Sequence, residues 1–512
     1  MDSIRIKNLR SIVDSGEIEL SRINILLGRN SSGKSSFLRL FPLLKETSRH
    51  ELRGPILWFD ENYDFGDFSN TLSRHAEGDK DMITMEFTWK QTNMWTRWYN
   101  PLAEYDETDH RKKKNIKVEI GISKHEDKNF FKKIHIVTDD NDILFENTAP
   151  NEHIKLTLNG RETNGGIYKW RYGSRGILPQ LSVESGISPK EIINASLRKI
   201  YDDKSISFDD FYIVSRLAAL TDDAIWKLIS EHLTKRKGKK AVKNFKQTDD
   251  YKNVIDTIAW IYLARYVSYI DEELSDYFNH TYYVTPLRYN FLRYMRNRDL
   301  AVEYVESTGK NVMEYILSLN EDERDSYIDY IGRTLEIRID VEGDENKSIC
   351  VTMKDGEHDN IVDVGYGYSQ VLPIATILWD RAYRKDARNN EDTIVIEQPE
   401  VHLHPAMQKR LARLFVEALN LAKTRSKKLT LIVETHSSTL VNHLGKYVQN
   451  NNAPAIPELL EYYQLDEESG VKIDNEDISV YLFDKQNGVS HIAKTAYDKS
   501  GRIVRWPIGF LD

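Results

Sequence analysis

The sequence predicts an α/β protein: a mixed sheet flanked by helices, with an antiparallel β subdomain and an inserted helical lobe. Three observations support this fold class. Apolar strand patterns alternate with helical ones near the N-terminus and again in the last third, which is the order that builds a parallel sheet. Residues 81–175 alternate between apolar and polar, as antiparallel strands do. Residues 188–280 carry apolar side chains three and four apart, which predicts helices at Ser188–Tyr201, Phe208–Leu233 and Val254–Tyr277.

The composition is that of an ordinary soluble chain with several parts. It has 512 residues, a formal net charge of -9 and one cysteine. At ~100–200 residues per domain we expect about two to four domains. The lone Cys350 excludes a disulfide framework and a multi-cysteine zinc site, and it fits a reducing cytoplasm. No apolar run approaches the roughly 18–20 residues that cross a bilayer, so we expect no membrane association.

The most specific motif lies near the N-terminus. The apolar strand pattern Ile23–Leu27 runs into Gly28–Ser35, which matches G-x-x-x-x-G-K-[ST] in full, and a helical pattern follows. In such a loop, backbone N–H groups at a helix N-terminus attract phosphate oxygens. The lysine reaches the β- and γ-phosphates, and the serine hydroxyl binds Mg²⁺. The residues that we expect to hold a nucleotide are Gly28, Asn30, Ser31, Ser32, Gly33, Lys34, Ser35 and Ser36.

Two further apolar strand patterns end in polar residues. Thr393–Ile396 leads into Glu397–Glu400 and resembles a Walker B strand, whose terminal carboxylate binds Mg²⁺ directly or through water. Leu429–Val433 leads into Glu434, Thr435 and His436, and a histidine at that strand end can hydrogen-bond a γ-phosphate. The helical pattern Ala406–Leu421 between them completes a strand–helix–strand unit of a parallel sheet.

A second glycine-containing turn, Val364–Gln370, precedes the helical stretch Val371–Trp379. We expect Ser369 to cap this helix and Pro373 to fall within its first turn, where proline is tolerated. A capped helix end of this kind attracts anions. Because one nucleotide does not need two such ends from one chain, we expect a second protomer to supply one of them.

The order of these motifs resembles the ABC-type ATPases of the SMC/RecF/OLD group. The closest likeness is to its short branch of "AAA family" ATPases, common in prokaryotic phage-defence and other mobile operons. Tyr283–Arg288 resembles the Y-x-x-P-L-R segment of that branch, and Ser500–Phe510 resembles its G-x-x-x-x-W-P-x-G-F ending. The likeness implies an ABC-type P-loop ATPase head that uses ATP and Mg²⁺. It also implies two heads closing around two nucleotides, and therefore a homodimer or higher homo-oligomer.

The resemblance assigns roles to single residues. Gln398 stands where the family has the acid that polarises the attacking water. An amide can orient water but cannot accept its proton, so we expect slow hydrolysis unless Glu400 or Glu434 takes over. The expected catalytic residues are Glu397, Gln398, Glu400 and His436; the expected Mg²⁺ ligands are Ser35 and Glu397; the expected signature motif, acting in trans, comprises Gly365, Gly367, Ser369 and Gln370.

Other candidate sites carry weaker signals. His402 and His404 could ligate a transition metal, but we favour a place for them at the contact between two heads. The acidic turn Asp139–Asp142 is typical of a hairpin tip rather than of a metal site.

Two basic runs, Lys235–Lys240 and Arg111–Lys114, are the best candidates for contact with nucleic-acid phosphates, although such runs are usually solvated loops. Trp95, Trp98 and Tyr99 could stack on bases, but aromatic residues more often pack in a core.

The motifs divide the chain into five expected parts. They are the first part of the head (1–80), the antiparallel β subdomain (81–180), the helical lobe (181–282), the second part of the head (283–455) and a small C-terminal cap (456–512). The tail after His436 contains no D-x-D pair, so we expect no nuclease activity in this chain. Its alternating segments around Asn487 and Gly488 predict that the cap contains a hairpin with its turn at these two residues.

The resemblance implies a nucleotide-gated sensor or scaffold in anti-phage defence, acting on a separate effector protein, a nuclease or a toxin. The alternative is a RecF- or SMC-like clamp that binds DNA without a dedicated effector. A transporter ATPase is disfavoured, because the insertion is too large and the C-terminal ending differs.

Overall fold

A computed structural model describes most of the chain. The described residues are 1–91, 114–150, 152–163, 167–184, 186–206, 221–237, 241, 244–289, 291–296, 302–384, 390–452 and 470–504. They form two compact units, and the chain passes between them several times. The first unit comprises Met1–Glu17, Leu43–Asp60 and Asp64–Asn279, and the second comprises Ile18–Pro42, Glu61–Tyr63 and His280–Asp512. The expected first part of the head, residues 1–80, is therefore divided between the two units.

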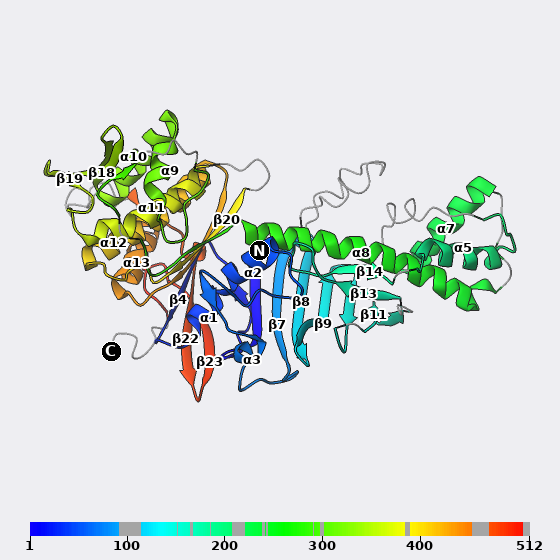
Figure 1. Ribbon diagram of the computed structural model, residues 1–512. Helices are drawn as coiled ribbons and strands as arrows, with labels where there is room; N and C mark the ends of the chain where they lie inside the picture. The colour runs from blue at the N-terminus through cyan, green and yellow to red at the C-terminus, as the bar shows by residue number, and fades with distance from the viewer. Residues whose placement is uncertain are drawn as a thin grey trace. The chain divides into compact units, whose positions relative to one another are not determined.

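An antiparallel sheet forms the body of the first unit, as the alternating pattern predicts. Its strands follow one another in the order β12-β11-β10-β9-β8-β7-β1-β2 (Figure 1). The turn Asp139–Asn141 joins β9 to β10 as a hairpin tip. The strands are β1 (Ser3–Leu9), β2 (Ile12–Asp14), β7 (Met82–Gln91), β8 (Lys114–His125), β9 (Lys128–Thr138), β10 (Asp142–Glu146), β11 (Lys155–Leu158) and β12 (Arg161–Thr163).

The long helix α8 (Asp249–Asn279) ties the helical region of the first unit to the strands. It packs against α5 and α7 and also against β14 (Figure 1). Trp260 on α8 donates to Thr163 Oγ1 at 3.1 Å, and Trp89 on β7 donates to Glu273 at 2.9 Å. The remaining elements are α5 (Pro189–Ile200), α7 (Asp222–Lys237), η2 (Phe245–Gln247), β13 (Tyr168–Arg171), β14 (Gln180–Val183), β5 (Phe59–Asp60) and α3 (Phe68–Thr71).

The helical patterns predicted at 188–201 and 254–277 are confirmed, and the second helix is longer than expected at both ends. The expected helical lobe is not separate from the sheet, because α8 continues from the lobe along the strands. Of the helix expected at Phe208–Leu233, residues 208–220 lie outside the described residues, and α7 covers the rest from Asp222.

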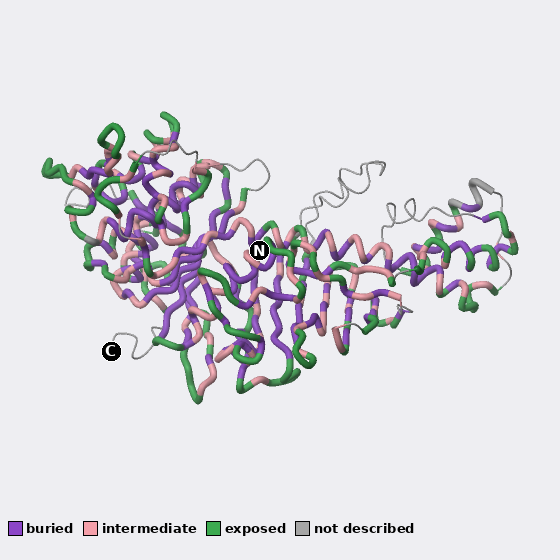
Figure 2. The backbone as a smooth tube through the Cα atoms, in the orientation of Figure 1, coloured by how far each residue is buried: buried purple, intermediate pink, exposed green. Residues whose placement is uncertain are grey.

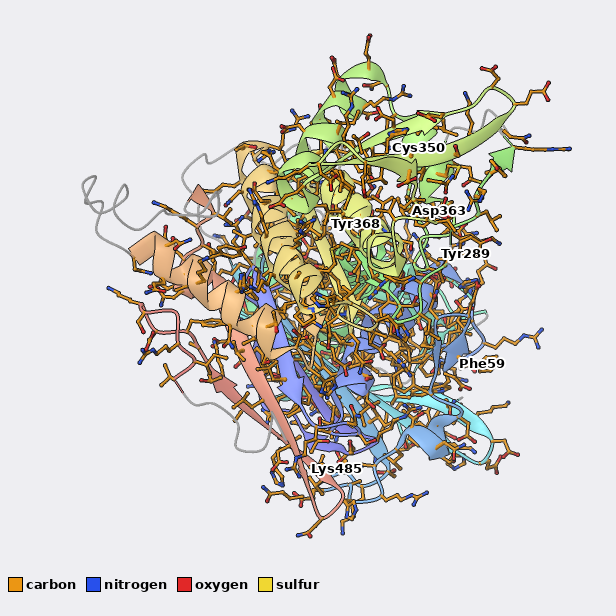
Figure 3. The ribbon with its side chains drawn as sticks, turned by 90° about the vertical axis from the view of Figure 1, so that its left-hand side faces the viewer. Phe59, Tyr289, Cys350, Asp363, Tyr368 and Lys485 are labelled. Atoms are coloured by element: carbon orange, nitrogen blue, oxygen red, sulfur yellow. The ribbon has the colours of Figure 1, made fainter. Side chains whose placement is uncertain are left out.

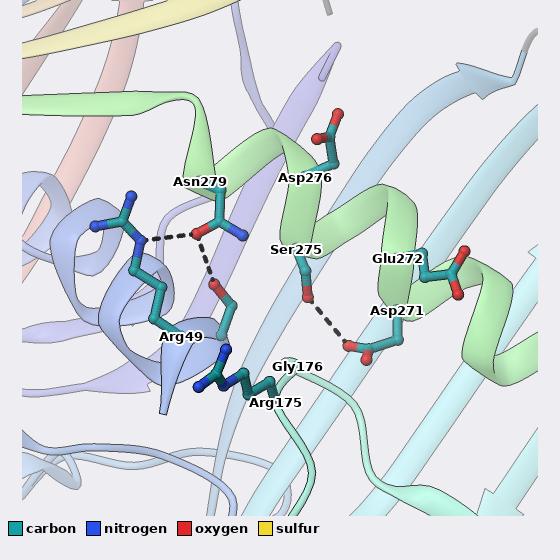
Figure 4. A pocket seen from close by; sticks show the side chains of 9 residues that line it. Arg49, Arg175, Gly176, Asp271, Glu272, Ser275, Asp276 and Asn279 are labelled. Atoms are coloured by element: carbon teal, nitrogen blue, oxygen red, sulfur yellow. Dashed lines mark hydrogen bonds between the residues drawn. The ribbon is translucent and has the colours of Figure 1, made fainter. Parts of the chain in front are cut away.

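A pocket of about 510 Å³ lies where α8 meets the loop before β14 (Figure 4). The Asp271 carboxylate on α8 accepts the backbone N–H groups of Ile177 and Leu178 at 2.6 and 2.7 Å. Gly176 has a φ of 143°, and a Cβ there would lie 2.0 Å from Asp271 Oδ2, so only glycine allows the loop to come this close. Despite the two backbone hydrogen bonds, burial raises the pKa of Asp271 to about 6.

We expect Asp271→Asn to stabilise the protein at pH 7.5 and not at pH 4. Because the folded-state pKa of Asp271 lies above its ordinary value, the native state binds a proton more readily, and stability falls as pH rises between about 4 and 6. Above this window, the ionised Asp271 carboxylate lowers the free energy of unfolding of the wild type by at most about 3 kcal/mol. Thermal unfolding of the variant and of the wild type at both pH values measures the difference in stability. Asp276→Asn, an exposed acid lining the same pocket, is the control. An equal change in Tm at both pH values would contradict the prediction.

A mixed sheet organises the second unit, in the order β15-β20-β21-β4-β22-β23. Only β23 runs antiparallel to its neighbour; the other pairings are parallel. The central strands are buried on both faces, and Figure 2 shows them in purple. The strands are β4 (Ile23–Gly28), β15 (Thr281–Val284), β20 (Glu391–Glu397), β21 (Lys428–Glu434), β22 (Ile478–Gln486) and β23 (Val489–Thr495).

Helices and a smaller antiparallel sheet surround the mixed sheet. The hydrophobic core gathers residues of its strands together with α9–α13. The helices are α1 (Lys34–Leu38), α9 (Val312–Ser318), α10 (Glu321–Leu335), α11 (Tyr366–Tyr383), α12 (Pro405–Thr424), α13 (Ser438–Asn452) and η4 (Asn475–Asp477); the small sheet holds β16 (Met295–Arg296), β17 (Ile337–Glu342), β18 (Asn346–Met353) and β19 (His358–Asn360). The short strands β3 (Ile18–Glu19) and β6 (Tyr63–Asp64) and the helix α2 (Leu40–Arg49) complete the elements of the described residues. The predicted α/β class is confirmed.

The C-terminal hairpin belongs to the mixed sheet, so the expectation of a separate cap at 456–512 was wrong for its described part. Asn487 and Gly488 form the predicted turn, with φ values of 50° and 87°. However, β22 pairs in parallel with β4, from Ile478 beside Ile23 to Phe483 beside Gly28. The first half of β22 is buried, as suits a strand inside the sheet rather than in a separate cap.

Helix α11 begins at Tyr366, and Ser369 is therefore not its N-cap as we expected. Gly365 precedes the helix with a φ of 102°, which glycine adopts readily, and this lets the chain turn into the helix earlier. As a result Pro373 lies inside α11 rather than in its first turn. No helix in the described part of the chain is long and apolar enough to span a membrane.

Candidate functional site

The glycine loop follows the buried strand β4, as predicted, and leads into α1. Gly28 has a φ of 149°, and a Cβ at this position would lie 2.0 Å from the carbonyl oxygen of Phe483 on β22. Ser31 and Gly33 also have positive φ values, of 62° and 102°. The loop therefore needs glycine at Gly28 because of the neighbouring strand and at Gly33 because of its own backbone.

Lys34 closes the loop from inside. Its ammonium group donates to the carbonyl oxygens of Gly28 and Arg29 at 2.9 and 2.8 Å. It also lies 3.7 Å from Glu434 Oε1, and both side chains are only 2% exposed. Burial lowers the pKa of Lys34, and the Glu434 carboxylate opposes this shift. A buried cation is thus held at the end of β4, against a carboxylate from the end of β21.

Ser35 points at the same carboxylate: its hydroxyl donates to Glu434 Oε2 at 2.9 Å. Glu434 and Glu397 are cross-strand neighbours at the ends of β21 and β20. Burial raises the pKa of Glu434 to about 7; the charge of Lys34 opposes this shift, and Glu397 adds to it. A hydroxyl and two carboxylates therefore gather beside the loop, and such oxygen donors suit Mg²⁺.

Glu397, the second predicted Mg²⁺ ligand, is engaged by other side chains. Arg39 donates to both of its carboxylate oxygens, at 2.9 and 3.2 Å, and the Tyr283 hydroxyl donates to Oε2. Arg39 lies between α1 and α2, and Pro42, in the first turn of α2, has no N–H to donate to the carbonyl oxygen of Leu38. The carboxylate that meets Ser35 directly is instead Glu434, which the sequence suggested only as a substitute base. The sequence did not indicate Arg39 as part of the site.

The first and last residues of the Y-x-x-P-L-R segment hold the end of β20 and the turn that follows it. Tyr283 on β15 binds Glu397, and Arg288 donates to the carbonyl oxygens of Gln398 and Pro399 at 3.2 and 3.4 Å. Gln398 has a φ of 46°, and its N–H donates to the Glu434 carbonyl at 2.9 Å. The sequence resemblance identified this segment without giving it a role; the structure makes it a brace for the predicted catalytic turn.

His436 presents a buried ring nitrogen to the site. Its backbone N–H donates to Glu400 Oε1 at 2.6 Å, while its side-chain Nε2 is buried with no hydrogen-bond partner. Burial, and then the charge of Lys34, lower the pKa of His436 to about 4, so the imidazole is neutral at pH 7. Burial raises the pKa of Glu400. A buried polar atom without a partner is costly, so Nε2 is suited to a ligand atom that enters the site.

The predicted signature residues lie in the first turns of α11 and just before it. Gly365 is exposed and Gly367 is half-buried, whereas Ser369 and Gln370 are 7% and 1% exposed. Gln370 Nε2 is buried with no hydrogen-bond partner. Only the glycine end of this motif is therefore open to solvent in one chain.

Of the two histidines after β20, His404 has a local structural role. His404 caps α12, where its Nδ1 accepts the N–H of Ala406 at 3.3 Å, and His402 is exposed with a φ of 64°. In the described part of the chain, neither belongs to a cluster of three metal-ligating side chains.

Several predicted contacts fall where the structure gives no side chains. The side chains of the two basic runs, Lys235–Lys240 and Arg111–Lys114, lie outside the described residues. The same holds for Trp95, Trp98 and Tyr99 and for residues 505–510 of the W-P-x-G-F ending. Their roles remain predictions.

Comparison with protein families matches residues 1–441 to the model of the AAA ATPase domain. No protein of curated function matches the chain. Similar solved structures include the SMC head bound to the C-winged helix domain of ScpA, with 10% identity, a TM-score of 0.36, and 98% of each chain covered. The SMC head domain from Thermotoga maritima has 10% identity and a TM-score of 0.35, with 96% of this chain and 97% of that chain covered. An Smc head from Pyrococcus furiosus, with an extended coiled coil and bound to the C-terminal domain of ScpA, has 11% identity, a TM-score of 0.35, and coverage of 97% and 96%.

Proposed function

We propose a role for this chain from one premise: it belongs to the AAA ATPase domain family, and is therefore an ATPase. We propose that Gly28–Ser36 hold ATP with Mg²⁺, and that hydrolysis is slow. We further propose that two copies close around two nucleotides, and that this closed state gates a separate effector protein.

The observation that supports the nucleotide site most directly is the set of groups that meet at the ends of β4, β20 and β21. Lys34, Ser35 and Glu434 are already in mutual contact, and the buried Nε2 of His436 has no partner. This combines a cation for phosphate oxygens with a hydroxyl and a carboxylate for a divalent ion. It also supplies a neutral imidazole that can hydrogen-bond a terminal phosphate.

Mg²⁺ would be held by Ser35 with the carboxylates of Glu397 and Glu434, and it neutralises phosphate charge when bound. The residues of the chain then have distinct tasks. Lys34 holds phosphate oxygens with an ammonium group that already spans the loop carbonyls. Arg39 and Tyr283 keep the Glu397 carboxylate in place. Their hold must loosen or rearrange for Glu397 to turn toward a metal ion.

Slow hydrolysis is supported by the groups around the expected attacking water. Gln398 carries an amide, which can orient water but cannot take its proton. Glu400 is hydrogen-bonded to the backbone of His436, and Glu434 faces Lys34 and Ser35. Either carboxylate would have to exchange these contacts to act as a base. An ATP-bound closed state would therefore be long-lived.

The wider role rests on the resemblance in motif order. We propose a cytoplasmic sensor or scaffold in anti-phage defence, whose effector is a separate nuclease or toxin. The DNA clamp stays the alternative, and it depends on the two basic runs. Co-purification with a neighbouring gene product supports the sensor. Salt-sensitive, ATP-dependent DNA binding that is lost when Lys235–Lys240 is neutralised supports the clamp instead.

With a non-hydrolysable ATP analogue and Mg²⁺, we expect the molar mass to double from the 59.7 kDa of one chain, because each nucleotide needs the signature turn of a second copy. Light scattering with the analogue, with ADP and without nucleotide measures this change. Lys34→Ala is the control and should keep its nucleotide-free mass under all three conditions. A wild-type protein that binds the analogue at unchanged mass would contradict closure of two heads.

A further inference from the structure

The small antiparallel sheet of the second unit carries a group of side chains that the nucleotide site does not use. Strand β18 lies between β17 and β19. Its residues alternate, so that Ile349 and Val351 join the hydrophobic core while Ser348, Cys350 and Thr352 occupy the other face. Figure 3 labels Cys350, the only cysteine of the chain.

Glu342 and His358 reach over Cys350 from the two neighbouring strands. Glu342 on β17 is opposite Ser348, and His358 on β19 is opposite Thr352, so both share the face of Cys350. Glu342 Oε1 lies 2.9 Å from His358 Nε2, and Glu342 Oε2 lies 3.4 Å from Cys350 Sγ. One ligand atom from each of the three residues lies within 4.8 Å of the others.

The three side chains are close enough to share one ion of the size of Zn²⁺: the 3.4 Å between Cys350 Sγ and Glu342 Oε2 is already a tetrahedral ligand spacing, and the 2.9 Å hydrogen bond between Glu342 and His358 would open slightly on binding. With Zn–S bonds of ~2.3 Å and Zn–N or Zn–O bonds of ~2.0–2.1 Å, ligand atoms in a tetrahedral site are about 3.3–3.6 Å apart. A thiolate, an imidazole and a carboxylate form a ligand set that selects Zn²⁺ over Mg²⁺ or Ca²⁺. We propose that Glu342, Cys350 and His358 form a Zn²⁺ site, with water as the fourth ligand.

Thr352 provides an interaction that such a site needs outside its ligands. Its hydroxyl lies 2.8 Å from His358 Nδ1, while the other ring nitrogen, Nε2, lies beside Glu342. A histidine that ligates through Nε2 keeps its proton on Nδ1, and a hydrogen bond there fixes the tautomer and the ring orientation. Thr352 is therefore a positioning residue for the proposed ion.

The three proposed ligands differ in burial, and the exposed side of the site would let a water molecule reach the ion. Cys350 is 7% exposed, whereas Glu342 and His358 are exposed. The thiol thus lies at the base of the site, and the fourth position opens to water, which is the pattern of a zinc site with three protein ligands.

A bound ion would link β17, β18 and β19 through their side chains. β19 is only three residues long, ends at Asn360 and leads into the turn before α11. Zn²⁺ would therefore fasten the strand that precedes the proposed signature turn. This inference goes beyond the proposed ATPase role, and the site can be tested without nucleotide.

The test is a Co²⁺ and Zn²⁺ titration of the full-length chain, first treated with a chelator and kept reduced and free of nucleotide. We expect one Co²⁺ per chain with the charge-transfer absorption of a thiolate ligand, and displacement of Co²⁺ by Zn²⁺. Cys350→Ala should abolish this absorption. His358→Gln, a change at an exposed side chain, should do so without disturbing the fold.

Thr352→Val removes the hydroxyl that positions the His358 ring and keeps a side chain of similar shape. We expect Zn²⁺ affinity to fall about 10–100-fold, with the thiolate absorption retained at saturation. Asp359→Asn removes an exposed acid beside His358 on the opposite face and should leave the affinity unchanged. Wild-type protein without thiolate absorption, or Cys350→Ala with unchanged Zn²⁺ affinity, would overturn the proposal. Neither result depends on whether the chain binds ATP.

Discussion

Lys34→Ala is expected to lower ATP affinity at least about 100-fold and to abolish measurable hydrolysis. The Lys34 ammonium group is the buried cation of the loop, bonded to two loop carbonyls and facing Glu434. Alanine removes the charge that holds phosphate oxygens and leaves Glu434 and Glu397 together without this counter-charge. Binding of a fluorescent ATP analogue and phosphate release at saturating ATP measure the two effects.

The matched control for this variant is Lys485→Ala. Lys485 is an exposed lysine on β22 (Figure 3), so its loss should change neither affinity nor rate. Thermal unfolding of both variants shows whether any loss of activity comes from the missing phosphate contact or from unfolding of the protein. Hydrolysis by a folded Lys34→Ala protein at the wild-type rate would exclude Gly28–Ser36 as the nucleotide site.

Gln398→Glu is expected to raise the turnover of ATP by about 10²–10⁴, the usual contribution of a well-placed general base. The substitution adds a group that can accept the proton of the attacking water. It keeps the side-chain length and the same left-handed backbone, where φ is 46°. Arg288 and the Glu434 carbonyl hold this turn through main-chain atoms, which the substitution leaves in place.

Gln398→Ala provides the comparison, because it removes the amide without adding a base. We expect its turnover to be below that of the wild type, since nothing then orients the water. If Gln398→Glu turns over no faster than the wild type, the proton is taken elsewhere, and Glu400 and Glu434 become the candidates. Fast turnover by both the wild type and Gln398→Ala would contradict the proposal of a slow ATPase.

Local sequence patterns predicted the parts of this molecule that depend on neighbours along the chain. The strand, loop and helix around Gly28–Ser35 follow from one short segment, and so do the antiparallel strands of the first unit. The predicted start of α11 at Ser369 was wrong. Gly365 adopts a positive φ readily, so the chain turns into the helix there, before it reaches Ser369.

Contacts between distant segments were not predictable in this way. Tyr283 reaches Glu397 only because β15 pairs with β20, and Arg39 reaches it because α1, which it directly follows, packs against β20. The order of strands in a parallel sheet is set by tertiary packing, which no local period reveals. For the same reason, the alternation in β22 did not show that this strand would pair with β4.

The place of β4 in its sheet also bears on how the protein is made. β4 lies between β21 and β22, and the backbone of Gly28 rests against Phe483. At ~5–20 residues per second, translation would reach β22 roughly 20–90 s after it has completed β4. Until then the first strand of the mixed sheet has an unpaired edge, which is a hazard for aggregation. The nucleotide loop is therefore synthesised well before it can take its final shape beside β22.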